Sequence, residues 1–198
     1  MQSATFFEAL AHILPADCLK TAAEDMRPYE CDGLSMYRAL PKCVALPENE
    51  AQLAAVMKEC HAHRVPVVVR GAGTGLSGGA MPDPNALLLS TAKMMRILDV
   101  DALACTARVQ PGVRNLAISE AVAPLGLYYA PDPSSQIACT IGGNVAENSG
   151  GVHCLKYGLT VHNIRKLRVV LMTGDIVDVG SDSLDEASPG GYDLLALM

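Results

Sequence analysis

The sequence predicts an α+β protein built from two α/β subdomains. Apolar residues from Leu53 to Cys60 recur at the period of an amphipathic helix, and a β-branched run, VPVVV, follows that helix. Glycine-rich stretches then separate further strand signals along the chain. We expect a helix and irregular lead-in over residues 1–39, a first subdomain over 40–95 and a second, incomplete subdomain over 96–198.

The elements of the first half are predicted from caps, breakers and periodicity. Ser3 is placed to cap a first helix that ends at Pro15. Prolines and a glycine interrupt Arg27–Pro47, which indicates an irregular approach. The remaining elements are a helix over residues 48–64, a buried strand over 65–69 and a second strand over 85–90.

The second half contains shorter elements between polar or glycine-rich segments. We expect a strand over 106–111, a helix from Arg114 closed by Gly126, and a strand hairpin that turns at Thr173–Asp175. Residues 127–151 read as a long loop-rich run, and residues 181–191 as a polar surface loop. The apolar ending, LLALM, is either a helix docked on the core or the start of a chain that continues.

Composition excludes several classes of function. The formal net charge is −6, so the chain lacks the basic footprint of a nucleic-acid-binding protein. Its seven cysteines are scattered without C-x-x-C spacing, which is typical of reduced thiols in the cytoplasm. No apolar run approaches the length of a membrane-spanning helix, and the first residues do not form a secretory signal.

The glycine-rich segment RGAGTGLSGG, at residues 70–79, matches the G-x-G-x-x-G pattern of dinucleotide-binding folds. That pattern requires a helix directly after the glycines, and Pro82 and Pro84 stand where its first turns would run. The segment also lacks the G-K-[S/T] of a P-loop and the G-x-S-x-G of a nucleophile elbow. We therefore predict a loop whose bare backbone offers N–H groups to a phosphate, rather than a plain turn between two strands.

A second segment, PDPSSQIACTIGGNVAENSGG, at residues 131–151, combines prolines, hydroxyl side chains and two glycine pairs. Such a segment can lie along an extended ligand and bond it through serine, threonine and asparagine side chains. Two backbone-exposing segments suit a long ligand that carries a pyrophosphate and a polar ring.

These two segments, together with RPYECDGLS at Arg27–Ser35 and the stretch Arg108–Ala138, resemble the PCMH-type FAD-binding domain of the vanillyl-alcohol oxidase and p-cresol methylhydroxylase superfamily. Within it, the resemblance is to the FAD subunits (D subunits) of bacterial glycolate oxidases, and it covers their N-terminal part. The implied fold is a PCMH-type domain of two α/β subdomains, truncated before its end and without the cap that holds substrate.

The resemblance implies the residues that contact FAD. The residues implied to hold the pyrophosphate are Arg70, Gly71, Ala72, Gly73, Thr74, Gly75, Leu76 and Ser77. Those implied to line the flavin and ribityl part are Pro131, Asp132, Ser134, Ser135, Thr140, Gly142, Gly143, Asn144, Asn148, Gly150 and Gly151. Relatives that attach FAD covalently use a histidine in or near the first segment, which has none here, so non-covalent FAD is implied.

The activity implied is FAD-dependent oxidation of a small 2-hydroxy acid, with glycolate to glyoxylate as the first expectation. No catalytic residue and no metal ligand can be named in this part of such an enzyme, and the chain alone is expected to be inactive. The alternatives are an FAD-dependent D-lactate or D-2-hydroxyglutarate dehydrogenase, or a non-catalytic nucleotide-binding module. The implied partners are a subunit with iron–sulfur clusters and a second flavin-domain-like subunit, in the cytoplasm or held at the inner membrane by those partners.

Two histidine motifs are weaker candidates. In Cys60-His61-Ala62-His63 the two histidines are about 200° apart on a helix and cannot share a tetrahedral metal ion, so a solvated helix end is predicted. His153-Cys154 follows the second glycine-rich segment, where packing or a local hydrogen bond is expected more than a role beside the flavin.

Overall fold

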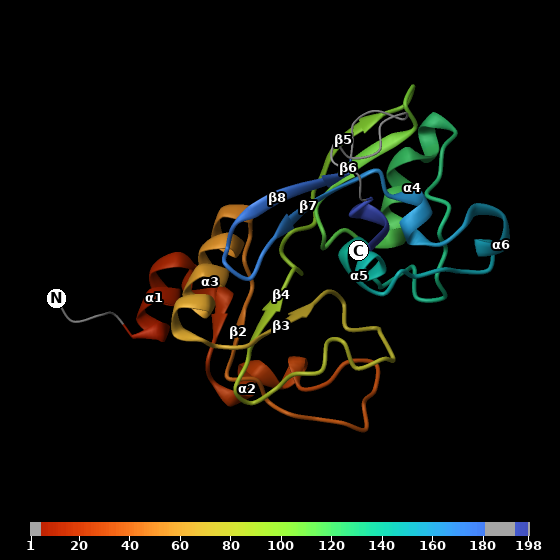
Figure 1. Cartoon of the computed structure of the whole chain (residues 1–198). Helices are drawn as coiled ribbons and strands as arrows, with labels where there is room; N and C mark the ends of the chain where they lie inside the picture. Colours follow the sequence, from red (N-terminus) through yellow and green to blue (C-terminus); the bar gives the residue numbers. More distant parts are fainter. Residues whose placement is uncertain (1–4, 181–192, 198) are drawn as a thin grey trace. The chain divides into compact units, whose positions relative to one another are not determined.

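The computed structural model describes residues 5–180 and 193–197, which form two compact units (Figure 1). The first unit comprises residues up to Met94 together with Val170–Asp175, and the second comprises Met95–Val169 and the residues from Ile176 onward. Ser3 and the predicted loop at 181–191 lie outside the described residues. None of the described helices is long and apolar enough to span a membrane.

The first unit contains a sheet, two packed helices and a lead-in of short turns. Its elements are α1 (Phe6–Ile13), η1 (Ala16–Cys18), β1 (Leu19–Lys20), α2 (Ala23–Met26), η2 (Arg27–Tyr29), β2 (Cys43–Ala45), α3 (Glu50–His63), β3 (Val67–Arg70) and β4 (Leu87–Ser90). The predicted helix at 48–64 is confirmed as α3, and the strand at 85–90 as β4. β2 was not predicted, because three residues between two prolines are too short for a periodic signal.

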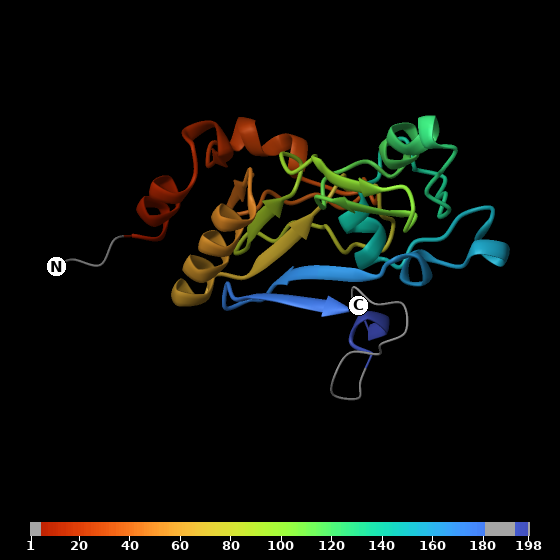
Figure 2. The same cartoon turned by 90° about the horizontal axis from the view of Figure 1, so that it is seen from above.

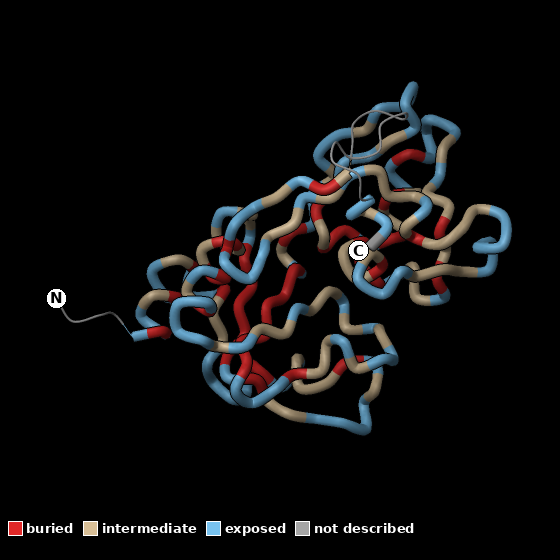
Figure 3. The backbone as a smooth tube through the Cα atoms, viewed as in Figure 1, coloured by how far each residue is buried: buried red, intermediate tan, exposed pale blue. Residues whose placement is uncertain are grey.

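The sheet order is β1-β2-β4-β3, and β4 pairs in parallel with both neighbours. β2 and β4 are buried at every residue, and Figure 3 shows this buried backbone at the centre of the unit. The strand predicted at 65–69 is confirmed as β3, but its predicted burial is wrong, because β3 is the half-buried edge strand and β4 takes the central place.

One apolar core joins the sheet, α3 and the lead-in. Val56, Met57 and Cys60 of α3 pack with the leucines of β4, and Phe6 and Leu10 of α1 belong to the same core. Figure 2 shows α3 running alongside the sheet, with α1 beside α3. The N-terminal residues are thus part of the first unit's core rather than a separate approach to it.

The cap of α1 differs from the one expected. Thr5, not Ser3, is the N-cap: its hydroxyl accepts from Glu8 N–H, and the Glu8 carboxylate accepts from Thr5 N–H at 2.8 Å. This reciprocal pair is a capping box, which the sequence T-F-F-E contains. The helix ends before Pro15, as predicted, with Leu14 at the C-cap.

The second unit is built from hairpins and short helices. Its elements are β5 (Ile97–Asp101), β6 (Thr106–Val109), α4 (Asn115–Val122), η3 (Ala123–Leu125), α5 (Ile141–Ala146), α6 (Cys154–Tyr157), η4 (Thr160–Asn163), β7 (Lys166–Val170), β8 (Ile176–Gly180) and η5 (Leu195–Leu197). β5 pairs with β6 and β7 with β8, each as a two-stranded sheet. Val113, Ile118 and Ile141 form a small core of this unit.

Several predictions for the second half are confirmed. Gly126 closes the α4–η3 segment with φ +73°, and Gly174, with φ +80°, stands in the turn between β7 and β8. Residues 127–151 are mostly loop, as predicted, with one short helix, α5, within them. Helix propensity does not predict α5, because two of its six residues are glycines and glycine is a poor helix former.

Candidate functional site

The first glycine-rich segment is the connection between two parallel strands. β3 ends at Arg70, and the chain returns to β4 without any helix between residues 71 and 86. The segment therefore begins at the carboxyl end of β3, the edge of a parallel sheet where ligands commonly bind. Within the described residues, the backbone N–H groups of Ala72 to Leu76 donate to no protein acceptor. They form a set of donors open to an anion.

The Arg70 side chain connects the start of this segment to residues 29–31 of the lead-in. Its guanidinium donates to the Cys31 carbonyl and lies 5.9 Å from the centroid of the Tyr29 ring. Gly73 has φ +71°, and a side chain there would collide with the Arg70 guanidinium. Glycine at position 73 is thus favoured by backbone conformation, because an L side chain is strained at this φ, whereas the Arg70 guanidinium ends a flexible side chain that can move aside.

The lead-in contributes a residue that the sequence argument did not name. Gly33 N–H donates to the Gly75 carbonyl at 3.0 Å, and a Cβ on Gly33 would lie 2.5 Å from that same oxygen. Asp32 shapes the turn by accepting from Leu34 N–H at 2.8 Å, while its second carboxylate oxygen is buried without a partner. The motif CDGLS lies within the resemblance, and its D-G pair was the available turn signal.

In the second unit, Thr140 and Asn144 bring unpaired polar atoms together around α5. Thr140 is its N-cap residue, yet the Thr140 hydroxyl has no hydrogen-bond partner and is buried. The Asn144 side-chain nitrogen is likewise buried and unpaired. Because a buried polar atom normally has a partner, these two atoms, within one helical turn, are available to a bound ligand or an ordered water.

The glycine pair of α5 divides into two roles. Gly142 N–H donates to the Pro111 carbonyl at 2.9 Å, and a Cβ there would lie 2.8 Å from the Pro111 Cβ. Position 142 therefore requires glycine because Pro111 of the same chain approaches it closely. The nearest atom to a Cβ on Gly143 is the Thr140 hydroxyl at 3.5 Å, so that glycine has ordinary space.

Asp132 joins the two ends of the second segment. Its carboxylate meets His153 Nδ1 at 2.6 Å, and this hydrogen bond holds the pKa of the Asp132 carboxyl below its ordinary value. A Cβ on Gly151 would collide with the Asp132 backbone, so this glycine permits the close approach. His153 therefore makes a hydrogen bond, but to a residue 21 positions earlier in the chain rather than to a local one. The neighbouring Pro131 is buried, and Asn115, which the sequence argument missed, donates to its carbonyl at 3.0 Å.

Four other predicted residues of the second segment flank α5 in the sequence: Ser134, Ser135, Asn148 and Gly150. The Asn148 side chain accepts from Val161 N–H at 3.0 Å, and a Cβ on Gly150 would lie 2.5 Å from Leu159. Ser134 is exposed, and the Ser135 carbonyl accepts from Cys139 N–H at 2.8 Å. The structure thus packs Asp132 against residues 151–153, and residues 148–150 against residues 159–161 at η4.

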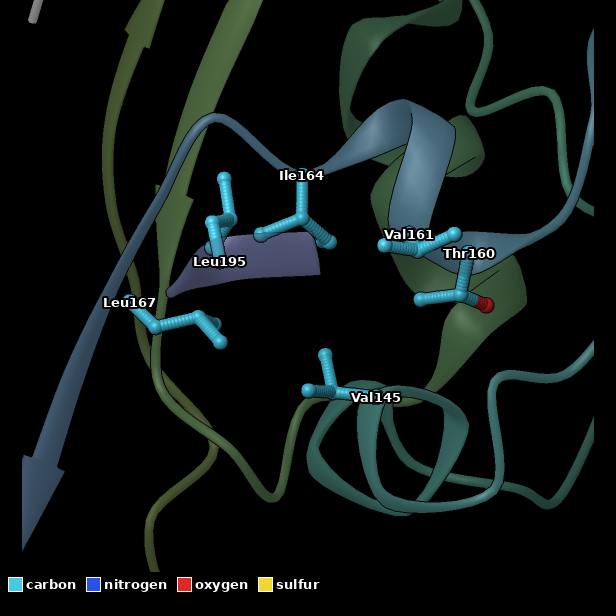
Figure 4. Close-up of a pocket in the computed structure, with 6 residues that line it drawn as sticks. All are labelled: Val145, Thr160, Val161, Ile164, Leu167 and Leu195. Carbon is cyan, nitrogen blue, oxygen red and sulfur yellow. The ribbon is translucent and has the colours of Figure 1, made fainter. Parts of the chain in front are cut away.

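A small apolar pocket beside α5 does not qualify as a cofactor site. Figure 4 shows the six side chains that line it, from Val145, Thr160, Val161, Ile164, Leu167 and Leu195. Its volume of about 10 Å³ is close to the room that one water molecule needs. It is a packing gap of the second unit.

The histidines of α3 lie where a solvated helix end was predicted. His61 and His63 are exposed, whereas Cys60 is buried, and burial raises the pKa of its thiol to about 12. In the described part of the chain, no three His, Cys, Asp or Glu side chains lie together as metal ligands would.

Solved structures share this fold. An alkyldihydroxyacetonephosphate synthase superposes on the whole chain with a TM-score of 0.82 at 20% identity, and the chain covers 40% of it. A p-cresol methylhydroxylase superposes on 88% of the chain with a TM-score of 0.78 at 22% identity, and the chain covers 35% of it. The fold is therefore that of a PCMH-type FAD-binding domain, as the resemblance implied.

The FAD binding domain family matches residues 41–180, and the chain belongs to this family. The glycolate oxidase subunit GlcD of Escherichia coli K12 is 63% identical over 88% of the chain, and that of Bacillus subtilis is 43% identical over 85%. The D-lactate dehydrogenase of Anaerostipes hadrus is 38% identical over 84%. The chain spans only about a third of the length of these relatives.

Proposed function

We propose that this chain is the FAD-binding part of a flavin-dependent oxidoreductase that oxidises a small 2-hydroxy acid, with glycolate as the first substrate to test. The observation that carries this proposal is the 63% identity to a glycolate oxidase subunit over 88% of the chain. The more distant D-lactate and D-2-hydroxyglutarate dehydrogenases make those acids the second candidates.

The first glycine-rich segment fits the FAD pyrophosphate. The open N–H groups of Ala72 to Leu76 match an anion that takes several hydrogen bonds at once. The absence of a side chain at Gly73 leaves the backbone accessible, and Arg70 adds a positive charge below it. We assign residues 70–77 to this role.

The second segment fits the polar edge of the flavin and the ribityl chain. The Thr140 hydroxyl and the Asn144 amide are buried and unpaired, so a ligand with ring nitrogens, carbonyls or hydroxyls would satisfy them. We assign Pro131, Asp132, Ser134, Ser135, Gly143, Asn148, Gly150 and Gly151 to the same wall, and Gly142 to its support. When bound, FAD supplies a two-electron acceptor, and this chain contributes binding and orientation.

The proposed attachment is non-covalent. The segment from Arg70 to Pro82 contains no histidine, cysteine or tyrosine to which a flavin could be linked. Precipitation of the FAD complex with acid should therefore release all flavin into the supernatant. Flavin that stays with the precipitate would contradict this part of the proposal.

A titration tests the cofactor assignment. The change in flavin emission on addition of protein reports binding. We expect Gly73→Val to abolish FAD binding, because the new side chain meets the Arg70 guanidinium and disturbs the donors above it. Gly126→Val is the matched control: it has the same kind of φ, +73°, but nothing within 4 Å. Equal FAD affinity in both variants would show that the first segment is misassigned.

Substrate identity requires the protein expressed from its full reading frame. We expect flavin reduction by glycolate under anaerobic conditions, followed by slower or no reduction with D-lactate and D-2-hydroxyglutarate. The opposite order would replace glycolate oxidation with one of the two alternatives. The proposed partners, a subunit with iron–sulfur clusters and a second flavin-domain-like subunit, should copurify with it from the cytoplasmic or inner-membrane fraction.

A further inference from the structure

Residues 29–34 of the lead-in contact Arg70 and the first glycine-rich segment through one main-chain hydrogen bond and two contacts of the Arg70 side chain. Gly33 N–H donates to the Gly75 carbonyl, and Arg70 reaches back to the Cys31 carbonyl and the Tyr29 ring. All of these contacts lie within the first unit. The family match begins only at residue 41, so this part of the lead-in lies outside it.

The hydrogen bond from Gly33 has a direct effect on one donor of the segment. A trans peptide is planar, so the Leu76 N–H points opposite to the Gly75 carbonyl in the same peptide plane. Holding the carbonyl toward Gly33 therefore turns the Leu76 N–H away from the lead-in. That N–H donates to no protein acceptor in the described residues, so it is available to a ligand on the other side.

The contact leaves no room for a side chain. A Cβ on Gly33 would lie 2.5 Å from the Gly75 carbonyl oxygen, 2.9 Å from the Thr74 carbonyl oxygen and 2.9 Å from Leu76. Two of these three atoms belong to the backbone, so the glycine-rich segment itself would have to move. The Asp32 carboxylate stabilises the turn that contains Gly33 by accepting a hydrogen bond from Leu34 N–H.

We infer that the Asp32–Leu34 turn is a positioning element of the cofactor site, with Gly33 as the positioning residue that orients the Gly75–Leu76 peptide toward the pyrophosphate. This inference rests on the proposed FAD site. It adds to that site a main-chain hydrogen bond from the lead-in, between Gly33 N–H and the Gly75 carbonyl.

The test compares Gly33→Ala with Ser35→Ala in the full chain. Ser35 lies in the same lead-in and is exposed, so its substitution should leave FAD affinity unchanged. We expect Gly33→Ala to raise the FAD dissociation constant at least tenfold and to shift the ³¹P resonances of bound FAD at saturating protein. The visible band of the bound flavin should keep its position, because the change is local to the pyrophosphate.

The outcomes separate this inference from the proposed function. A wild-type chain that binds no FAD contradicts the proposed function itself. A wild-type chain that binds FAD, together with a Gly33→Ala variant of equal affinity and equal ³¹P spectrum, overturns the positioning role alone. Should Gly33→Ala fail to fold, Asp32→Ala serves instead, because it removes the acceptor of the turn and is expected to weaken FAD binding severalfold. Unchanged affinity in that variant would overturn the inference as well.

Discussion

Thr140 and Thr160 show how the same residue type has different roles in the second unit. Both are buried, but the Thr160 hydroxyl donates to the Ser149 carbonyl at 2.7 Å, whereas the Thr140 hydroxyl has no partner. A buried hydroxyl without a hydrogen bond reduces the stability of the free protein. It is retained most simply for a ligand, which is the role we propose for Thr140.

Substitution by valine should separate the two threonines. Thr140→Val removes an unpaired polar atom, so we expect the free energy of unfolding of the apo chain to stay equal or to rise, while FAD affinity falls. Thr160→Val breaks a formed hydrogen bond, so the apo chain should lose about 1 kcal/mol with FAD affinity retained. Urea denaturation and FAD titration of both variants provide the measurements. A Thr140→Val variant with lower stability and normal FAD affinity would assign this hydroxyl a structural role.

At the scale of single elements, α1 shows what a local motif determines. The Thr5–Glu8 capping box satisfies N–H groups at the start of the helix, and Phe6 and Leu10 hold the helix to the core. Local hydrogen bonding decides where the helix begins, and packing decides that it persists.

The cap gives a prediction at this scale. Thr5→Ala removes the hydroxyl that accepts from Glu8 N–H, so the free energy of unfolding should fall by about 1 kcal/mol. Thr21→Ala, at an exposed threonine of the same unit, serves as the control and should change it little. Equal unfolding midpoints for the two variants in urea would mean that the cap contributes nothing measurable.

α5 shows the opposite case, where local propensity is overridden. Its sequence, IGGNVA, has two glycines in six residues, and the helix is held by hydrogen bonds from Ile141 and Gly142 N–H to the carbonyls of Val113 and Pro111. A Cβ at position 142 would be too close to Pro111. The glycine that weakens the helix by propensity is thus the residue that allows it to pack.

At the scale of the whole molecule, two carboxylates accept hydrogen bonds that join segments far apart in the chain, and these bonds link stability to acid pH. The His153 hydrogen bond lowers the pKa of Asp132 below 3.8, and that of Lys93 lowers the pKa of Asp17. A carboxyl with a lowered folded-state pKa stabilises the fold fully above its unfolded pKa. That contribution is lost as the pH falls through the folded-state value.

Asp132→Asn tests this linkage. We expect wild type to be more stable than the variant at about pH 6, and this advantage to disappear as the pH falls below 3.8 and through the lower folded-state pKa. His153→Gln should flatten the pH dependence in the same way, because it removes the hydrogen bond that lowers the pKa of Asp132. Urea midpoints measured across this range provide the check, and parallel curves for wild type and both variants would show that the pair carries no pH-dependent stability.

Much of the fold follows from patterns within the sequence. Helical periodicity predicted α3, and β-branched and leucine runs predicted β3 and β4. Gly126 marked the end of the α4–η3 segment, and Gly174 marked the turn between β7 and β8. The prolines after the first glycine-rich segment correctly indicated that no helix follows it. These features are local, since each depends on residues a few positions apart.

The sequence by itself therefore determined the class of the protein, an acidic chain with an FAD-binding domain that contains two glycine-rich segments. The tertiary structure alone decided that β3 and β4 run in parallel, that Gly33 bonds Gly75, and that α5 packs on Pro111. It alone also showed that Thr140 and Asn144 are buried without partners. These facts depend on contacts between residues far apart in the chain, which the folded core brings together and no local pattern encodes.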